Sequence, residues 1–304
     1  MNIMVTGATG YIGGRLVERL LDEGHHVHVL VRSAERVAAH SWSDRVRVVE
    51  GDLLAPDTLA GRFDGIEVAY YLVHAMGTRG DFALRDRQAA QNFVAAARGV
   101  PQVIYLGGIL PKVEDSREIS KHLASRAEVG AILRQAIPTT EFRAGPIIGS
   151  GSASFDMVRY LTQRLPIMVA PRWIMNEVQT IGTQDILSYL VQAAGRDDVE
   201  GIIEIGAEPL TFKQMMHVYA DVRGLRRVII PLPVLTPRLA ALWVGLVTPI
   251  PNSLAVPLVE GIVHPVVGDP SAALRLFPGI RPISYREAVE RALEDGEEPG
   301  SRAS

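Results

Sequence analysis

A glycine-rich turn near the start of the chain constrains the fold more than any other feature. It reads Thr6-Gly7-Ala8-Thr9-Gly10-Tyr11-Ile12-Gly13 and joins the strand-like run Ile3–Val5 to an amphipathic helix. The first glycine permits a tight turn, the second lets the backbone approach a diphosphate, and the third lets the helix pack on the strand. The start of such a helix offers unpaired N–H groups and a positive dipole to an anion. Strand, turn and helix in this order predict a dinucleotide-binding site.

Strand-like and helix-like segments alternate through the first half of the chain. Repeated strand–helix units with short connections predict a parallel sheet covered by helices on both faces. The expected class is therefore α/β, a Rossmann-type doubly wound parallel sheet with a smaller C-terminal substrate lobe. The expected strands are Ile3–Val5, Val27–Val31, Val46–Val49, Val68–Val73, Val103–Leu106 and about 139–144, and the expected helices include 81–98 and about 119–136.

Regularity falls after residue 150. Thr211 is the expected cap of a helix at 212–223, and Ser284 with Glu287 has the spacing of a capping box. Six prolines, at 231, 233, 237, 249, 251 and 257, are expected to cut the chain into short pieces. We expect a Rossmann domain over 1–150, a mixed lobe over 151–295 interleaved with the sheet, and a disordered tail over 296–304. Further expected elements are helices at 155–164, 183–194 and 284–294 and a strand at Ile202–Ile205.

Composition limits the classes of function. A net charge of -3 gives no support for a nucleic-acid partner, which requires a basic face. The absence of cysteine excludes disulfides, thiolate nucleophiles and cysteine-based metal sites. The histidines at 25, 26 and 28 lie on a turn and a strand without an evident carboxylate partner, so no metal site is expected. No signal-peptide pattern and no apolar stretch of about 18 residues is present, so a cytoplasmic protein without a transmembrane segment is expected.

The end of the second predicted strand indicates which dinucleotide is preferred. An acidic residue there favours NAD, whereas an arginine accommodates the 2′-phosphate of NADP. This sequence has Arg32-Ser33 at that point, no acid before Glu35, and Arg36 one turn further on. A guanidinium can hold a phosphate through two charge-assisted hydrogen bonds. We therefore expect NADP(H) rather than NAD(H); the alternative is that Arg32 is simply solvated.

Four segments resemble the short-chain dehydrogenase/reductase superfamily, in particular its atypical, extended branch near the NmrA-like and epimerase/dehydratase-like NAD(P)H-binding proteins. They are the glycine-rich turn, Gly51-Asp52-Leu53, Tyr105-Leu106-Gly107-Gly108, and Arg143-Ala144-Gly145-Pro146-Ile147-Ile148-Gly149, the last resembling a loop that contacts nicotinamide. Asp52 is either an acceptor for the adenine amino group, with Leu53 against the ring, or a turn-initiating residue. The expected cofactor-binding residues are Thr6, Gly7, Thr9, Gly10, Tyr11, Ile12, Gly13, Arg32, Ser33, Asp52, Leu53, Leu72, Val73, His74, Gly107, Arg126, Pro146 and Ile147.

The catalytic positions depart from that family. Typical members carry a Ser after the fifth strand and a Tyr-x-x-x-Lys pair on the next helix. Here the strand ends in Gly107-Gly108, and the alignment places His122 at the Tyr position and Arg126 at the Lys position. Arg126 can hold a ribose hydroxyl but cannot shuttle a proton at neutral pH, whereas His122 can donate one. The expected catalytic residues are His122 and Arg126; the alternative is that His122 is a partly exposed residue with no catalytic part. Other candidates for the acid are Tyr71, His74, Tyr105, Ser120, Lys121 and Ser125.

The second lobe is expected to cover the ligand crevice, which lies beyond the C-terminal ends of the strands. If its apolar residues line a pocket rather than form plain core, the substrate is largely apolar, with an anionic or carbonyl group at Arg172. The proline-broken segment 239–263 is expected to be a short helical pair rather than a hydrophobic lid or a membrane-surface contact. The candidate lining residues are Ser150, Ser152, Phe155, Met157, Tyr160, Met168, Arg172, Trp173 and Met175.

Three functions are compatible with these features. The favoured hypothesis is an NADPH-dependent reductase of a small, mostly apolar carbonyl or enone compound. The alternative is a non-catalytic NADP(H)-binding redox sensor or assembly protein, which the missing Tyr and Ser support. A nucleotide-sugar epimerase or dehydratase is disfavoured, because such enzymes resemble the family with Tyr and Lys intact. The expected partner is a small apolar molecule, and a homodimer is compatible with the sequence.

Overall fold

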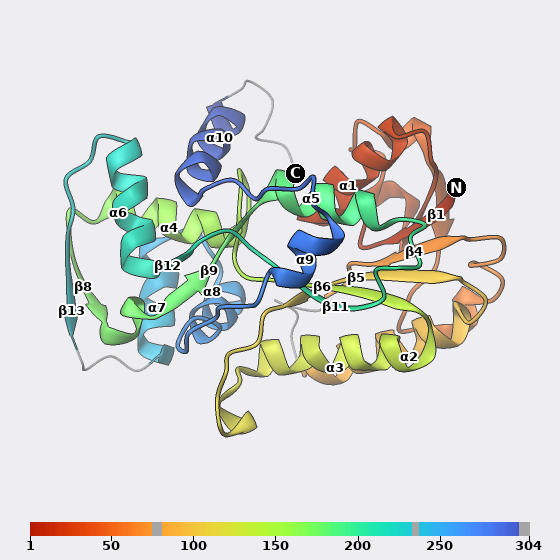
Figure 1. Cartoon of the computed structure of the whole chain (residues 1–304), viewed down its shortest axis with the longest axis horizontal. Helices are drawn as coiled ribbons and strands as arrows, with labels where there is room; N and C mark the ends of the chain where they lie inside the picture. Colours follow the sequence, from red (N-terminus) through yellow and green to blue (C-terminus); the bar gives the residue numbers. More distant parts are fainter. Residues whose placement is uncertain (75–80, 233–236, 298–304) are drawn as a thin grey trace.

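A parallel β-sheet forms the centre of the protein (Figure 1). The computed structural model describes residues 1–74, 81–232 and 237–297, and within these residues seven parallel strands pair in the order β11-β6-β5-β4-β1-β2-β3. This arrangement confirms the predicted doubly wound α/β class. The order reverses between β1 and β4, where such a sheet opens a crevice for a ligand. The strands are β1 (Asn2–Thr6), β2 (His26–Val31), β3 (Arg47–Glu50), β4 (Val68–Tyr71), β5 (Gln102–Gly108), β6 (Thr139–Ala144) and β11 (Gly201–Ile205).

Helices cover both faces of the sheet (Figure 1). The helices α1 (Tyr11–Asp22), α5 (Thr183–Ala193) and α9 (Ser271–Leu276) pack on one face. The helices α2 (Phe82–Ala96) and α3 (Lys121–Ala136) pack on the other face. β1, β4 and β5 in the middle of the sheet are buried on both sides, as the continuous apolar run of β1 predicts.

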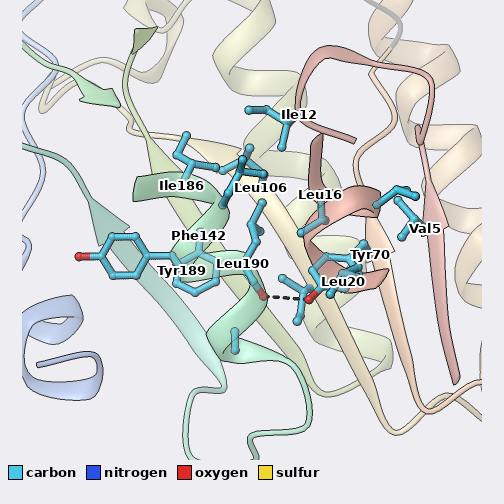
Figure 2. Close-up of a cluster of buried hydrophobic side chains, with 14 of the residues drawn as sticks. Val5, Ile12, Leu16, Leu20, Tyr70, Leu106, Phe142, Ile186, Tyr189 and Leu190 are labelled. Atoms are coloured by element: carbon cyan, nitrogen blue, oxygen red, sulfur yellow. Dashed lines mark hydrogen bonds between the residues drawn. The ribbon is translucent and has the colours of Figure 1, made fainter. Parts of the chain in front are cut away.

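The α1 face shows why the first helix docks on the sheet. Ile12, Leu16 and Leu20 recur at helical spacing and are buried against the strands and α5 (Figure 2). The Tyr70 hydroxyl in this core donates a 2.8 Å hydrogen bond to the carbonyl oxygen of Leu190 (Figure 2). This bond satisfies two buried polar groups and joins β4 to α5 across the core.

A third hydrophobic cluster, separate from the two that flank the sheet, lies in the part of the chain beyond residue 146 together with Ile109. The chain also returns to the sheet there, because β11 pairs with β6. The proposed division at residue 150 stays a prediction. The elements outside the sheet are β7 (Ile147–Ile148), α4 (Ala153–Arg164), β8 (Ile167–Pro171), β9 (Glu177–Gln179), β10 (Ile181–Gly182), β12 (Pro209–Thr211), α6 (Phe212–Val222), β13 (Val228–Leu232), α7 (Pro237–Val247), α8 (Asn252–Glu260) and α10 (Tyr285–Glu297).

Local capping follows the sequence signals. The Thr211 hydroxyl accepts from the backbone N–H of Gln214, whose side chain bonds back, so α6 begins with a capping box. The Ser284 hydroxyl accepts a 3.2 Å bond from the backbone N–H of Glu287 at the start of α10. α7 and α8 pack against each other as the predicted helical pair. α10 extends two residues into the segment expected to be a tail, and residues 298–304 lie outside the described residues.

The prolines of the second half do not prevent strand pairing. β8 and β13 form a parallel two-stranded ribbon, although β8 ends at Pro171 and β13 contains Pro231. Each strand of a two-stranded ribbon is an edge with one unpaired side, where a proline is tolerated. The prediction that Pro231 cuts the chain is therefore wrong. The fourth sheet strand is also shorter than predicted, since β4 ends at Tyr71 and Leu72 and Val73 follow it without regular structure.

Candidate dinucleotide-binding and active site

The glycine-rich turn leaves the N-terminus of α1 open. Gly10 is the N-cap residue, and within the described residues no side chain caps it. The first-turn N–H groups therefore lack a side-chain partner, which suits an anionic ligand. Gly7 has a φ of 74°, and a Cβ on it would lie 2.6 Å from the carbonyl oxygen of Leu72. A Cβ on Gly13 would overlap the carbonyl oxygen of Gly7, so both positions require glycine.

A cleft of about 370 Å³ lies beside this turn, at the C-terminal ends of β1, β2 and β4. Its position is the switch point of the sheet, where Rossmann folds bind dinucleotides. The open helix end, Arg32, Arg36 and Asp52 are the groups around the cleft that match the phosphates, ribose and adenine of such a group. Ten predicted cofactor residues line it: Thr6, Gly7, Thr9, Gly10, Arg32, Asp52, Leu53, Leu72, Val73 and His74.

Two exposed arginines mark one end of the cleft. Arg32 follows β2, and Arg36 ends the short 3-10 helix η1 (Ala34–Arg36); both line the cleft, whereas Glu35 does not. The carboxylate of Glu50 accepts a 2.8 Å bond from the backbone N–H of Ala34, which ties the end of β3 to η1. The cations rather than the neighbouring acid therefore face the ligand site.

Asp52 has the predicted turn role and also lies at the cleft. Its Oδ1 accepts a 2.9 Å hydrogen bond from the backbone N–H of Leu54, which stabilises the turn after β3. The same residue lines the cleft together with Leu53. An adenine contact is therefore geometrically compatible with a turn role.

The other predicted cofactor residues do not line this cleft. The Tyr11 hydroxyl is 2.9 Å from the Thr183 hydroxyl and borders a separate small cavity. Ile12 is buried in the core and Ser33 is the half-buried N-cap of η1. Gly107, Pro146, Ile147 and Arg126 lie at or beside the ends of β5, β6 and β7. Their binding roles stay predictions.

A chain of hydrogen bonds joins α2, the segment after β4, and α3. His74 Nδ1 lies 2.8 Å from Asp86 Oδ2, and His74 Nε2 lies 2.9 Å from His122 Nδ1. The Ser125 hydroxyl donates a 3.1 Å bond to the same Asp86 oxygen. His74 and Asp86 also line the cofactor cleft. The predicted catalytic residue His122 is therefore buried and bonded to a wall of the cleft, not partly exposed.

Burial controls the protonation of this pair. Desolvation lowers the pKa of His122 to about 2, with Arg126 and His74 acting in the same direction. Desolvation also lowers the pKa of His74, against the opposing effect of its hydrogen bond to Asp86. Both rings are therefore neutral at pH 7, and each neutral ring has one donor and one acceptor nitrogen.

Arg126 and the Gly107-Gly108 pair stand where the resemblance predicts the family's Lys and Ser. The Arg126 guanidinium donates to the carbonyl oxygen of Leu106, and its Nε is buried without a hydrogen-bond partner among the residues described. A Cβ on Gly108 would lie 2.9 Å from Leu123 Cδ2 and 3.8 Å from Arg126 Nε. The space that a serine side chain needs is therefore filled by Leu123, which explains glycine at this position.

Sequence reasoning missed Asp86. Its signal is a charged residue on the apolar face of α2, because Ala89, Ala90 and Phe93 follow at i+3, i+4 and i+7 and are all buried. A carboxylate buried on such a face needs a specific partner.

The remaining candidates for a proton donor are otherwise engaged. Burial raises the pKa of Tyr71 well above its usual value. The Tyr105 hydroxyl donates a 3.0 Å bond to the backbone carbonyl of Arg126. Ser120 caps α3, and Lys121 is exposed at its start. Ser125 contacts Asp86 and so belongs to the hydrogen-bonded chain.

A separate cavity of about 450 Å³ lies within the third hydrophobic cluster. Its fifteen lining residues are all apolar or aromatic and come from α4, β8, α6, α7, α8, the 3-10 helix η5 (Arg172–Met175) and Ile262 just after α8. Three predicted lining residues, Met157, Met168 and Trp173, contribute to it. Arg172 is exposed and does not line it, so the expected contact of Arg172 with a polar substrate group is not supported. The Nε1 of Trp173 is buried without a hydrogen-bond partner within the described ranges.

Comparison with known proteins gives the family of the chain. A family model described as NAD(P)H-binding matches residues 7–141. A ceramide reductase of Caulobacter vibrioides is 30% identical over 242 residues, which cover 76% of this chain and 73% of that protein. A 3 beta-hydroxysteroid dehydrogenase/Delta 5→4-isomerase of Mycobacterium tuberculosis is 28% identical over 105 residues, only 34% of this chain and 28% of that protein. The photosystem II assembly factor Ycf39 of Cyanophora paradoxa is 39% identical over 69 residues, 22% of this chain and 21% of that protein.

Solved structures share the fold at low identity. The triphenylmethane reductase of Citrobacter sp., solved with NADP(H), has a TM-score of 0.74 at 18% identity, covering 95% of this chain and 99% of that chain. The Bordetella bronchiseptica enzyme WbmG, solved with NAD, has a TM-score of 0.72 at 17% identity, covering 97% and 93%. The chain belongs to the NAD(P)H-binding, short-chain dehydrogenase/reductase-like family. None of its described helices is long and apolar enough to cross a membrane.

Proposed function

We propose that this protein is an NADP(H)-dependent reductase of a largely apolar carbonyl or enone compound. The observation that carries the proposal is the 450 Å³ cavity with entirely apolar or aromatic lining, in the same chain as a dinucleotide cleft. A pocket of this volume and lining favours an apolar ligand of moderate size. Similarity to a ceramide reductase over three quarters of the chain supports reduction of such a compound.

Different cleft residues bind different parts of the dinucleotide. The open end of α1 holds the diphosphate, and Arg32 and Arg36 hold the 2′-phosphate that distinguishes NADP(H) from NAD(H). Asp52 and Leu53 contact the adenine. When bound, the reduced nicotinamide supplies the hydride.

The chain from Asp86 to His122 supplies the proton. If a carboxylate at Asp86 accepts the Nδ1–H of His74, then His74 Nε2 accepts the Nδ1–H of His122. In this arrangement His122 Nε2 carries a lone pair and accepts a proton from an alcohol. In the direction of reduction the Asp86 carboxyl first takes up a proton from solvent and both hydrogen bonds then run the other way, so His122 Nε2 donates its proton to the new alkoxide. One proton then moves along each bond, and Asp86 becomes the carboxylate.

A non-catalytic, NADP(H)-binding assembly role is the second candidate. The family's Tyr and Ser are replaced by His122 and Gly108, and a short segment is similar to the assembly factor Ycf39. Neutral His122 is also a weaker acid than an imidazolium. This role predicts tight NADPH binding with no turnover.

The test is NADPH consumption with a panel of long-chain ketones, enones and quinones. We expect turnover by the wild-type protein and a large loss in His122→Ala, with NADPH affinity retained. The exposed His26 provides the matched control, and His26→Ala should behave as wild type. Tight NADPH binding without turnover on any compound would contradict the reductase and favour the second candidate.

A further inference from the structure

The β8–β13 ribbon lies at the opposite end of the molecule from β1 and β4 (Figure 1), and it carries an exposed apolar face. Strand register pairs Ile167 with Val228 and Val169 with Ile230. Side chains at alternate positions share a face, so these four and Leu232 point outward while Met168 and Ile229 point inward and are buried. The five outward side chains are 40–65% exposed, and they are five of the fourteen large apolar side chains that the described residues expose.

The flanks of this face are positively charged. The two segments that contain the ribbon, 159–176 and 222–232, hold six arginines and no acidic residue, in a chain of net charge -3. Arg164 and Arg226 are exposed near the N-terminal ends of the two strands, and Arg172 is exposed just after β8. Branched apolar side chains between arginines are the pattern that binds anionic membrane surfaces.

The neighbouring helix α7 exposes two further apolar side chains. α7 packs against β8, and its Leu242 and Leu246 lie one turn apart and are 52% and 83% exposed. Ile167 and Val169 also line the 450 Å³ apolar cavity. The ribbon is thus both an exposed apolar face and one wall of that cavity.

We propose that this face docks on the surface of an anionic lipid bilayer. The charge pattern favours a bilayer over a second copy of the chain, because a symmetric contact between two ribbons would bring the two sets of arginines together. An anionic surface instead compensates them, while the five outward side chains enter the interface between headgroups and acyl chains. This inference does not depend on hydride transfer, since docking is measured without cofactor or substrate.

Vesicle flotation of the full chain tests the proposal. We expect recovery with vesicles of equal phosphatidylcholine and phosphatidylglycerol, little recovery with pure phosphatidylcholine, and release by added salt. Val169→Ser with Ile230→Ser should lower recovery several-fold. Leu84→Ser with Leu274→Ser, which changes two exposed leucines on α2 and α9, is the matched control and should not.

A second variant keeps the test valid if the ribbon variant unfolds. Arg172→Gln with Arg226→Gln changes only exposed side chains and should lower recovery with anionic vesicles several-fold while the melting temperature stays unchanged. No recovery of the wild-type protein, or equal recovery with neutral and anionic vesicles, would overturn the proposal. The proposal would also be overturned if the wild-type protein does not float and forms a dimer in solution that the double variant Val169→Ser with Ile230→Ser dissociates.

Discussion

His74 and His122 share a 2.9 Å hydrogen bond, although 48 residues separate them in the chain. His74 follows β4 and His122 lies in the first turn of α3, so the neighbouring strands β4 and β5 bring the two rings together. Asp86 continues the chain from α2. Three elements thus place a carboxylate and two imidazoles in one hydrogen-bonded chain that ends at His122.

Asp86→Asn tests whether protons move along the hydrogen-bonded chain of Asp86, His74 and His122. The amide keeps the size of the carboxylate but cannot take up a proton, so we expect kcat to fall by about 10²–10⁴, the usual contribution of general acid–base catalysis. NADPH affinity should change little. Glu128→Gln on α3 is the control, because this exposed residue pairs with Arg87 and not with the histidines. Steady-state kinetics with an equal kcat for wild type and Asp86→Asn would show that the carboxylate plays no part.

Stability should fall as the pH decreases below about 6.5. His122 has its pKa lowered to about 2 in the folded protein against 6.5 for an unperturbed histidine, so the unfolded chain binds an extra proton between these values. The stability that His122 contributes is complete above pH 6.5 and is lost as the pH falls toward 2. For this one group the slope is at most about 1.4 kcal/mol per pH unit.

Chemical denaturation at a series of pH values measures this slope. His122→Gln removes the titrating group and should flatten the curve between pH 6.5 and 4. His26→Gln, at an exposed histidine on β2, should leave the curve unchanged. Parallel curves for wild type and His122→Gln would contradict the assignment.

Adjacent glycines in α1 should respond differently to alanine. A Cβ on Gly13 would overlap the carbonyl of Gly7, whereas the nearest atom to a Cβ on Gly14 is the Ala8 carbonyl oxygen at 3.4 Å. Gly13→Ala should therefore push α1 away from the turn, lower the melting temperature and abolish NADPH binding. Gly14→Ala should be neutral or stabilising, by up to about 1 kcal/mol of helix propensity. Equal melting temperatures for the two variants would show that the close approach is not required.

The first half of the chain was predictable because two independent patterns agree there. Apolar periodicity predicted the strands and helices, and glycine spacing predicted the turn. The position of the cleft at the switch point therefore followed from the sequence alone. The second half lacked such agreement. Proline content indicated broken chain, yet β8 and β13 pair, because strand pairing between residues about 60 apart depends on tertiary contacts that no local pattern encodes.

The catalytic region shows a similar limit. Alignment placed His122 and Arg126 on one helix, but the partners His74 and Asp86 come from other elements. Local spacing within α3 carries no information on those partners. Only the buried position of Asp86 on the apolar face of α2 gave a sequence signal, and reading it requires knowing which face is buried.

Arg32 should determine the choice between the two dinucleotides. Charge-assisted hydrogen bonds contribute about 1.5–3 kcal/mol each, so losing one from the 2′-phosphate should weaken NADPH binding by roughly 10- to 150-fold. NADH lacks this phosphate, so its affinity in Arg32→Ala should stay near that of wild type. Glu35→Ala is the control, because Glu35 is exposed three residues away and does not line the cleft. Fluorescence titration with both reduced dinucleotides gives the four affinities, and an unchanged ratio of NADPH to NADH affinity in Arg32→Ala would rule out a phosphate contact at this residue.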